Sequence, residues 1–303
     1  RGKVTPDNDE HKVIYKDYGL YLQATYENKN TIHFYEYGSY YLLQYLNGRG
    51  IVNLDSLDPE SIIRYIQDSR QERQREILCE LRSIFKYLNR NDLLTVIKGI
   101  HAPRIKRIIS TLTDDEQNRI MTVMKNGSVT LRDAAIVLLG LSCGIRACDL
   151  INLRLSDINW ENEIISFRQR KTGNLVCLPI TIAIGNAITR YLIEERPVTQ
   201  NDFVFVRELA PFDPLTDHSS CYAVVRRVFG KAGIDKDGRI FGMHMLRHNS
   251  ASTMVRNAVP IETIAAILGH ASPDTTDIYI TTDEATLKQC VLPMTGISQG
   301  VNP

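Results

Sequence analysis

The hydrophobic pattern of this 303-residue chain is helical almost throughout and changes to a strand-like period in one place only. There, two short apolar runs at residues 164–167 and 175–180 flank residues 170–174, which read RKTGN. Two such runs around a Gly-Asn pair predict a β-hairpin that turns at Gly173 and Asn174. Because helical segments precede and follow it, the sequence predicts a mainly α fold with one small antiparallel β-sheet (α+β).

The chain is long enough for two domains, and a boundary between them is visible near residue 100. Before this boundary, the spacing of apolar residues predicts helices over residues 9–27, 31–47 and 69–89. A further helix of the same bundle starts at Asp58-Pro59-Glu60. After it, Thr113-Asp114-Asp115-Glu116 forms a capping box that opens a new helix. We therefore predict a helical domain over residues 1–95, a linker over 96–110 and a second domain over 111–303.

The predicted linker is basic. Residues 95–109 contain no Asp or Glu but four cationic side chains: Lys98, Arg104, Lys106 and Arg107. An extended segment of this kind can lie along DNA phosphates, but a solvated basic loop has the same composition, and both interpretations stay open. The formal net charge is only +1, so any DNA-binding surface must come from such local concentrations of charge.

Composition argues against several other classes of protein. The longest apolar stretch, near residues 134–141, falls far short of the roughly 20 residues that a membrane-spanning helix needs. Residues 1–10 lack the apolar core of a signal peptide. The six cysteines include no Cys-x-x-Cys pair and no zinc-like spacing, so we expect reduced thiols and no metal. We expect a cytoplasmic, nucleoid-associated protein of prokaryotic type.

Five short motifs of the second domain carry residues suited to work on a phosphodiester. In chain order these are Arg146 after a glycine, Lys171 at the hairpin tip, His244 and Arg247 on one helix face, His270 at a Leu-Gly-His helix end, and Tyr279. Each motif alone is more often a matter of packing, capping or a surface ion pair than of catalysis. Their order and spacing are therefore the specific signal.

The chemistry of these residue types fits strand cleavage. Two arginines can hold the non-bridging oxygens of a phosphodiester and stabilise a pentacoordinate transition state. Lysine and histidine can move protons to and from oxygen atoms. A tyrosine hydroxyl can attack phosphorus and form a covalent intermediate. Because the sequence offers no cluster of carboxylates for magnesium, a two-metal nuclease is not expected.

This order of residues resembles the tyrosine recombinase, or phage integrase, family, whose pattern is Arg…Lys…His-x-x-Arg…His/Trp…Tyr. The segments Gly-Ile-Arg, Lys-Thr-Gly, His-x-Leu-Arg-His, Leu-Gly-His and Thr-Thr-x-x-Tyr are also similar, and the resemblance covers about residues 110–290. The preceding bundle fits the family's core-binding (SAM-like) domain more loosely. One departure is Asp149, where the family often has Glu; we interpret this shorter carboxylate as structural, orienting a neighbouring group.

The resemblance implies a mechanism without metal or other cofactor. Tyr279 would attack the scissile phosphate, form a 3′-phosphotyrosyl link and release a 5′-hydroxyl. The implied roles of the others are phosphate binding by Arg146, Arg247 and His270, protonation of the leaving oxygen by Lys171, and deprotonation of the tyrosine by His244.

The resemblance also implies an assembly. Two domains would clamp double-stranded DNA, and four subunits would form a synaptic complex at a specific recombination site. A helix over residues 284–292 would dock on a neighbouring subunit, although packing on its own domain is the alternative. Two questions stay open: whether an accessory DNA-bending or excision factor takes part, and whether an arm-binding domain precedes Arg1.

Several biological roles remain compatible with the sequence. Integration and excision of a mobile genetic element, such as a transposon, is the first expectation. Resolution of chromosome or plasmid dimers, or DNA inversion, would use the same chemistry. A type IB topoisomerase shares the chemistry but relaxes DNA without site preference, and a regulator with a decayed active site would bind DNA without cutting it. The target sequence and crossover length are not encoded in any pattern that we identify.

Overall fold

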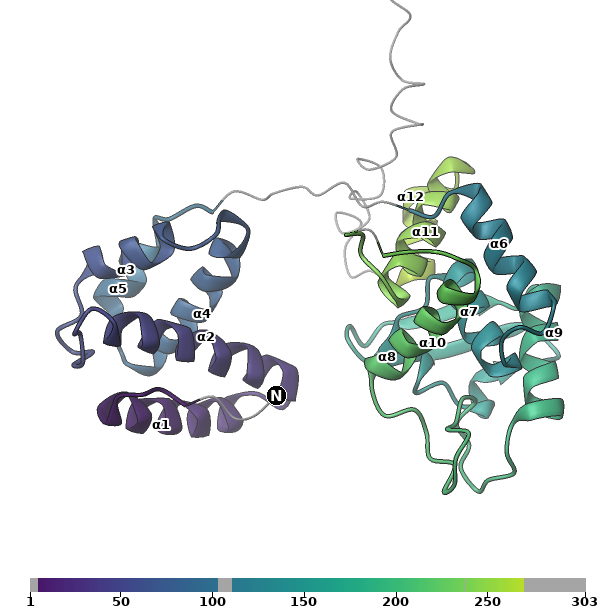
Figure 1. Ribbon diagram of the computed structural model, residues 1–303, viewed down its shortest axis with the longest axis horizontal. Coiled ribbons are helices and arrows are strands. Elements are labelled where there is room, and N and C mark those ends of the chain that lie inside the picture. The colour runs from purple at the N-terminus through teal and green to yellow at the C-terminus, as the bar shows by residue number, and fades with distance from the viewer. Residues whose placement is uncertain (1–4, 103–110, 237, 270–303) are drawn as a thin grey trace, which may run out of the picture. The chain divides into compact units, whose positions relative to one another are not determined.

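The computed structural model describes residues 5–102, 111–236 and 238–269, and the chain divides into two compact units, residues 1–107 and 108–303. Helices dominate both, and the strands form one three-stranded antiparallel sheet in the second unit. The predicted mainly α fold with a small antiparallel sheet is therefore confirmed (Figure 1).

The first unit is a bundle of helices. Its elements are α1 (Asp9–Thr25), α2 (Lys29–Asn47), α3 (Pro59–Gln67), the 3₁₀ turn η1 (Gln71–Arg73), α4 (Gln74–Tyr87) and α5 (Asn91–Lys98). α4 packs against the other four helices and carries the buried side chains Leu81, Ile84 and Phe85. Asp58 caps α3 as predicted, because its carboxylate accepts a hydrogen bond from the Ser61 backbone amide at 2.9 Å.

Helix α5 is a difference from the sequence prediction. We expected residues 96–110 to be linker, but α5 continues to Lys98, so the predicted domain end at residue 95 falls inside a helix. Its side chains Leu93 and Ile97 are fully buried in the core of the first unit. This apolar face explains why the chain stays helical here, and Lys98 in the last turn is favourable for the C-terminal end of the helix.

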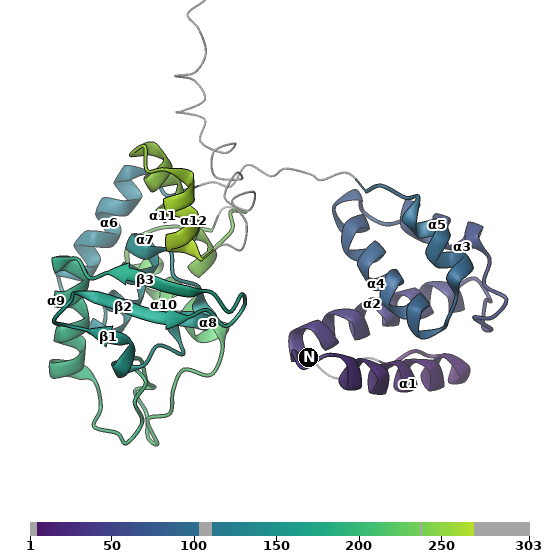
Figure 2. The ribbon, with the colours of Figure 1, turned by 180° about the vertical axis from the view of Figure 1, so that it is seen from behind.

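The second unit combines helices with the sheet. Its helices are α6 (Asp114–Lys125), α7 (Leu131–Cys143), α8 (Ala147–Leu150), α9 (Ile182–Arg190) with the π-turn η3 (Tyr191–Glu195), α10 (His218–Lys231), α11 (Met243–Arg256) and α12 (Ile261–Leu268); a 3₁₀ turn, η2 (Leu155–Asp157), precedes the sheet. The apolar helix α7 packs against α9, α10 and α11 and forms the centre of this unit. Figure 2 shows the sheet in front, with α12 beside β3.

The sheet contains the predicted hairpin. Its strands are β1 (Ile158–Asn159), β2 (Ile164–Arg168) and β3 (Leu175–Pro179), in the order β1-β2-β3. Ile165 pairs with Leu178 and Phe167 with Val176, and these four side chains are all buried. Alternate residues of both strands therefore face the core, and the loop between them carries residues 169–174 to one end of the sheet.

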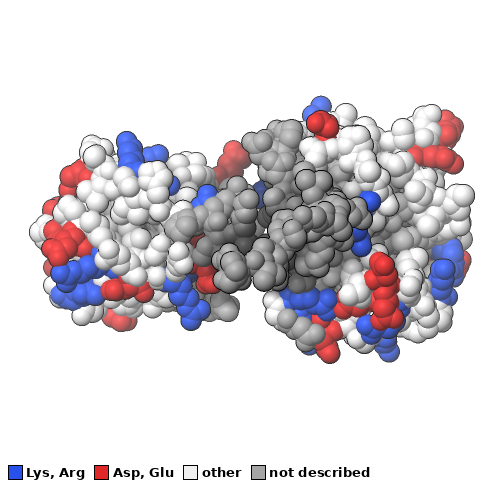
Figure 3. All heavy atoms as spheres, turned by 90° about the horizontal axis from the view of Figure 1, so that it is seen from above, with Lys and Arg blue, Asp and Glu red and all other residues white. Residues whose placement is uncertain are grey.

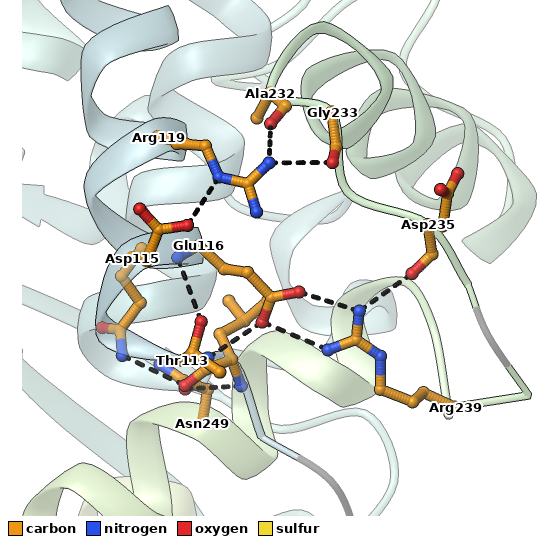
Figure 4. A network of polar contacts seen from close by, with 11 residues as sticks. Thr113, Asp115, Glu116, Arg119, Ala232, Gly233, Asp235, Arg239 and Asn249 are labelled. Atoms are coloured by element: carbon orange, nitrogen blue, oxygen red, sulfur yellow. Dashed lines mark hydrogen bonds and ion pairs between the residues drawn. The ribbon is translucent and has the colours of Figure 1, made fainter.

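The start of α6 is held by the predicted capping box. The Thr113 hydroxyl accepts from the Glu116 amide at 3.2 Å, and the Glu116 carboxylate accepts from the Thr113 amide at 2.9 Å. Arg239 then donates two hydrogen bonds to the same carboxylate, at 2.8 and 3.1 Å (Figure 4). Asn249 of α11 accepts from the Leu112 amide nearby, so the cap also joins α6 to distant parts of the unit.

Two surface properties bear on the classes considered above. None of the described helices is long and apolar enough to cross a membrane. On the face of each unit that Figure 3 shows, cationic and anionic side chains are interspersed over the described surface.

Candidate active site

Arg146 is placed by a sharp break between two helices. α7 ends at Gly144, whose positive φ of 61° lets its amide bond the Gly140 carbonyl at 3.1 Å. A side chain at Gly144 would also come within 2.7 Å of Leu268, so both conformation and space require glycine here. Arg146 then adopts an extended conformation at the N-cap of α8 and is half-buried.

Arg247 lies one turn after His244 on α11 and is 5% exposed. Its guanidinium donates to the Gly144 carbonyl at 2.7 Å and to the Leu268 carbonyl at 2.7 Å. The same side chain therefore binds the C-terminal end of α7 and the C-terminal end of α12. Both acceptors are neutral backbone oxygens, so these two contacts fix the guanidinium without cancelling its charge.

Gln169 lies at the end of β2 and is 3% exposed. Its side-chain oxygen accepts hydrogen bonds from Arg146 and, at 2.8 Å, from the Thr172 hydroxyl. Its side-chain nitrogen donates to the Leu268 carbonyl at 2.9 Å. One amide thus contacts the segment of Arg146, the hairpin loop and the end of α12.

Lys171 is exposed in the hairpin loop, and its neighbours Arg170 and Thr172 hold that loop in place. Before it, the Arg170 backbone amide donates to the buried carboxylate of Asp149 at 2.9 Å. After it, Thr172 binds Gln169. The carboxylate of Asp149 therefore ties the loop to α8, while the Lys171 side chain stays accessible.

The charges of these residues act on His244. Its side chain is more than one-third exposed, yet its pKa lies below the ordinary value, first because of partial burial and then because of the positive charges of Arg247, Lys171 and Arg146. The neighbouring His248 has its pKa lowered to about 4, mainly by burial. The imidazole of His244 is consequently neutral near pH 7 and able to accept a proton.

The end of α12 completes the described part of the site. Gly269 ends this helix with a positive φ of 63°, and a side chain there would overlap Gln169 at 2.3 Å. α12 is held on α11 through a small apolar cluster of Ala251, Ile264 and Leu268. His270 follows directly in the sequence, but His270 and Tyr279 lie outside the described residues.

The four predicted residues that the structure describes, Arg146, Lys171, His244 and Arg247, thus come together from three separated segments. Of the predicted linker cations, Lys98 is the last residue of α5, and Arg104, Lys106 and Arg107 lie outside the described residues. Within the described residues, no group of three or more His, Cys, Asp or Glu side chains is arranged to hold a metal ion.

Gln169 was not identified from the sequence, although a signal was present. Ile165 and Phe167 face the core, so the period of two places residue 169 on the same inner face. A polar residue on the apolar face of a strand, two positions before a candidate catalytic lysine, is a reason to examine its partners.

Chemically, the arrangement favours binding of an anion. Three cationic side chains surround a neutral histidine, and among the described residues no carboxylate lies within ion-pair distance of Arg146. A phosphodiester offers both the negative charge and the hydrogen-bond acceptors that such a group can stabilise.

Comparison with known proteins gives consistent results. A family model described as the phage integrase family matches residues 110–286. The chain is 35% identical over 186 residues to y4gC of Sinorhizobium fredii, named for the integrase/recombinase class, and the match covers 60% of this chain and 95% of that protein. It is 27% identical over 280 residues to the tyrosine recombinase XerA of Pyrococcus horikoshii, covering 92% of each. Against a further S. fredii relative, y4rA, the match spans only 64% of the relative's length.

A solved structure extends the comparison to the fold. The chain matches XerH site-specific recombinase bound to a palindromic difH substrate, with a TM-score of 0.68 and 19% identity. The match covers 95% of this chain and 90% of that one. At this identity the likeness concerns the fold, which is shared across both units.

Proposed function

The chain belongs to the phage integrase family of enzymes that cut and rejoin DNA strands, and from this membership we propose that it recombines specific DNA sites through a covalent bond to Tyr279. The observation that carries the proposal is that Arg146, Lys171 and Arg247 lie near enough to His244 for their charges to lower its pKa. Lys171 lies 25 positions after Arg146 and Arg247 lies 101 positions after it, so titratable side chains of separate segments come within reach of one another, as a reaction centre requires.

In the proposed reaction, the hydroxyl oxygen of Tyr279 attacks the scissile phosphorus while the bond from phosphorus to the 5′-oxygen breaks. His244 takes the tyrosine proton, and Lys171 gives a proton to the leaving 5′-oxygen. Arg146 and Arg247, with His270, stabilise the charge on the non-bridging oxygens. Rejoining reverses these steps with a new 5′-hydroxyl, so no external energy source is needed.

The low pKa of His244 supports its assignment as the base. A histidine that is neutral at pH 7 can accept a proton at once, whereas a protonated one could not. Lys171 suits the acid role because its side chain is accessible on the hairpin loop, while Thr172 and Arg170 fix the backbone on either side.

A nicked suicide duplex tests the central assignment. Sites are first recovered by trapping the protein covalently on genomic DNA and sequencing the attached fragments. A nicked duplex with a recovered site should then accumulate a covalent adduct with the wild-type protein and none with Tyr279→Phe. An adduct that persists in Tyr279→Phe would contradict the assignment of the nucleophile.

The same trapped sites distinguish the candidate biological roles. We propose integration and excision of a mobile genetic element, which predicts sites at the ends of an element and at its insertion points. Sites confined to one position on a chromosome or plasmid would instead indicate dimer resolution. Relaxation of supercoiled DNA without preferred sites would indicate a topoisomerase.

We also propose assembly into a tetramer on paired DNA sites, with the segment over residues 284–292 contributed to a neighbouring subunit. Truncation after Thr282 should then abolish tetramers on DNA while leaving binding of one subunit to a half-site. Unchanged tetramer assembly would show that this segment serves its own subunit.

A further inference from the structure

We propose that Gln169 is a positioning residue that sets the relative placement of Arg146, the Lys171 loop and the end of α12, and so controls the rate of strand cleavage without contacting DNA. The inference rests on the proposed function, because it assigns a role within the same reaction centre. Nothing in the family resemblance pointed to this glutamine.

The first support is the number and direction of its contacts. The side chain has one acceptor atom and one donor atom, and both are used. The oxygen accepts from Arg146 and Thr172, and the nitrogen donates to the Leu268 carbonyl. The three partners belong to segments that are separated along the chain, so Gln169 acts as a cross-link between them.

The second support is that glutamine is the residue type that fits. The reverse amide orientation would place its NH₂ against the guanidinium of Arg146, donor against donor, so the partners fix the orientation. A glutamate here could still accept a hydrogen bond from Arg146. Its second carboxylate oxygen, however, would face the Leu268 carbonyl oxygen without a proton between them, and its charge would partly neutralise the arginine. Only a neutral amide positions Arg146 and preserves its full charge for a phosphate.

The third support is the packing around the amide. Gln169 is 3% exposed, and the α carbon of Gly269 lies so close that an added side chain would overlap the amide at 2.3 Å. The Leu268 carbonyl is also the acceptor for Arg247 at 2.7 Å. Arg146 and Arg247 are therefore connected through one amide and one carbonyl, which fixes the distance between the two guanidinium groups that would grip one phosphate.

A double-mutant cycle tests the proposal. The variants are Gln169→Leu, Arg146→Ala and the combination, with Gln169→Glu as a variant that keeps an acceptor. The measurements are the single-turnover rate of adduct formation on the nicked duplex with a trapped site, and the dissociation constant for the same duplex. Gln117→Leu is the matched control, because Gln117 also donates to a backbone carbonyl, that of Leu112 at 3.4 Å, in the same unit.

We expect Gln169→Leu to slow cleavage by about 10- to 100-fold, the scale of a small misplacement of reacting groups, with little change in DNA affinity. Gln169→Glu should also slow it, because the bond to Leu268 is lost. In the Arg146→Ala background the same change should slow cleavage by a smaller factor than in the wild-type background, since only its effect on the Lys171 loop and on the end of α12 remains. Multiplicative losses, or a fall in affinity that accounts for the slower rate, would overturn the proposal.

A measurement without DNA keeps the inference separate from the proposed function. In ¹⁵N-arginine-labelled protein, the Arg146 guanidinium, assigned from Arg146→Ala, should rotate and exchange protons faster in Gln169→Leu than in wild type or Gln117→Leu. An unchanged Arg146 signal would refute the positioning role. If instead covalent trapping on genomic DNA recovers no site with the wild-type protein while this signal responds as expected, the proposed function fails and the structural role of Gln169 stands.

Discussion

Two arginine networks of the second unit differ in what receives their hydrogen bonds. At the start of α6, Arg239 binds the Glu116 carboxylate through two hydrogen bonds, so a full negative charge faces the positive one (Figure 4). At the candidate active site, Arg247 binds two backbone carbonyls and Arg146 binds the amide of Gln169. The first network balances charge, whereas these contacts hold arginines in place through neutral acceptors.

The difference separates stability from function. A carboxylate partner lowers the cost of burying a guanidinium, and removing that partner destabilises the fold because it leaves the buried charge unpaired. A neutral acceptor satisfies the hydrogen-bonding groups but leaves the charge available for an incoming anion. The α6 network should therefore matter for unfolding and little for catalysis, and the site network should show the opposite balance.

The largest expected effect tests this contrast with two matched substitutions. Arg247→Lys keeps one positive charge but cannot reach both carbonyls, and it should slow adduct formation by about 100- to 1000-fold. Arg239→Lys, which changes the same residue type in the α6 network, should leave the single-turnover rate within about threefold of wild type. Equal losses in the two variants would show that the two networks do not differ in function.

The next effect concerns stability. Glu116→Gln removes the charge that Arg239 binds and should lower the free energy of unfolding of the second unit by about 2 kcal/mol, measured by denaturant titration. Because Arg239 lowers the pKa of Glu116 below its ordinary 4.5, the wild-type advantage is present above that pH and declines as the pH falls through the lowered pKa. An advantage that grows in acid would contradict this sign.

A smaller effect is expected from the cap itself. Thr113→Ala removes the hydroxyl that accepts from the Glu116 amide and should cost about 1 kcal/mol of unfolding free energy. Thr113→Ser keeps the hydroxyl and serves as the control. If both variants lose the same stability, then packing of the Thr113 methyl group, rather than capping, is responsible.

The smallest effect is a displacement of one titration midpoint. The NMR titration of His244 should have its midpoint below pH 6.5, because burial and the nearby cations favour the neutral ring. Arg146→Ala removes one of these cations and should move the midpoint upward, towards the ordinary value. A wild-type midpoint at or above 6.5, or a downward shift in the variant, would contradict the electrostatic description of the site.

Much of the fold was predictable because its signals are local. The hairpin, the Thr113 capping box and the start of α3 at Asp58 each depend on a few adjacent residues, and the structure contains all three. Helix α5 was not predicted because two signals overlap in this segment. The absence of acidic residues beyond position 95 indicates a linker, whereas the apolar positions Leu93 and Ile97 indicate a helix.

The sequence singled out four residues that the structure brings together, Arg146, Lys171, His244 and Arg247, but not the contacts that hold them. The order of motifs singled out Arg146 and Arg247 before any geometry was known. The partners of Arg247 lie 103 and 21 residues away in the sequence and are backbone carbonyls, which carry no side-chain signature. The role of Gln169 likewise depends on a register that becomes clear only when the strand, Arg146 and α12 are seen together.

The Leu268 carbonyl joins two hydrogen bonds of different strength. One oxygen atom accepts from the charged Arg247 at 2.7 Å and from the neutral Gln169 at 2.9 Å, so two unequal bonds hold the end of α12. Charge-assisted hydrogen bonds are the stronger kind, so the bond from the amide is the weaker of the two. A substitution that displaces this end of α12 should therefore break the Gln169 bond first and loosen Arg146 with it, while the cluster of Ala251, Ile264 and Leu268 still holds α12 on α11.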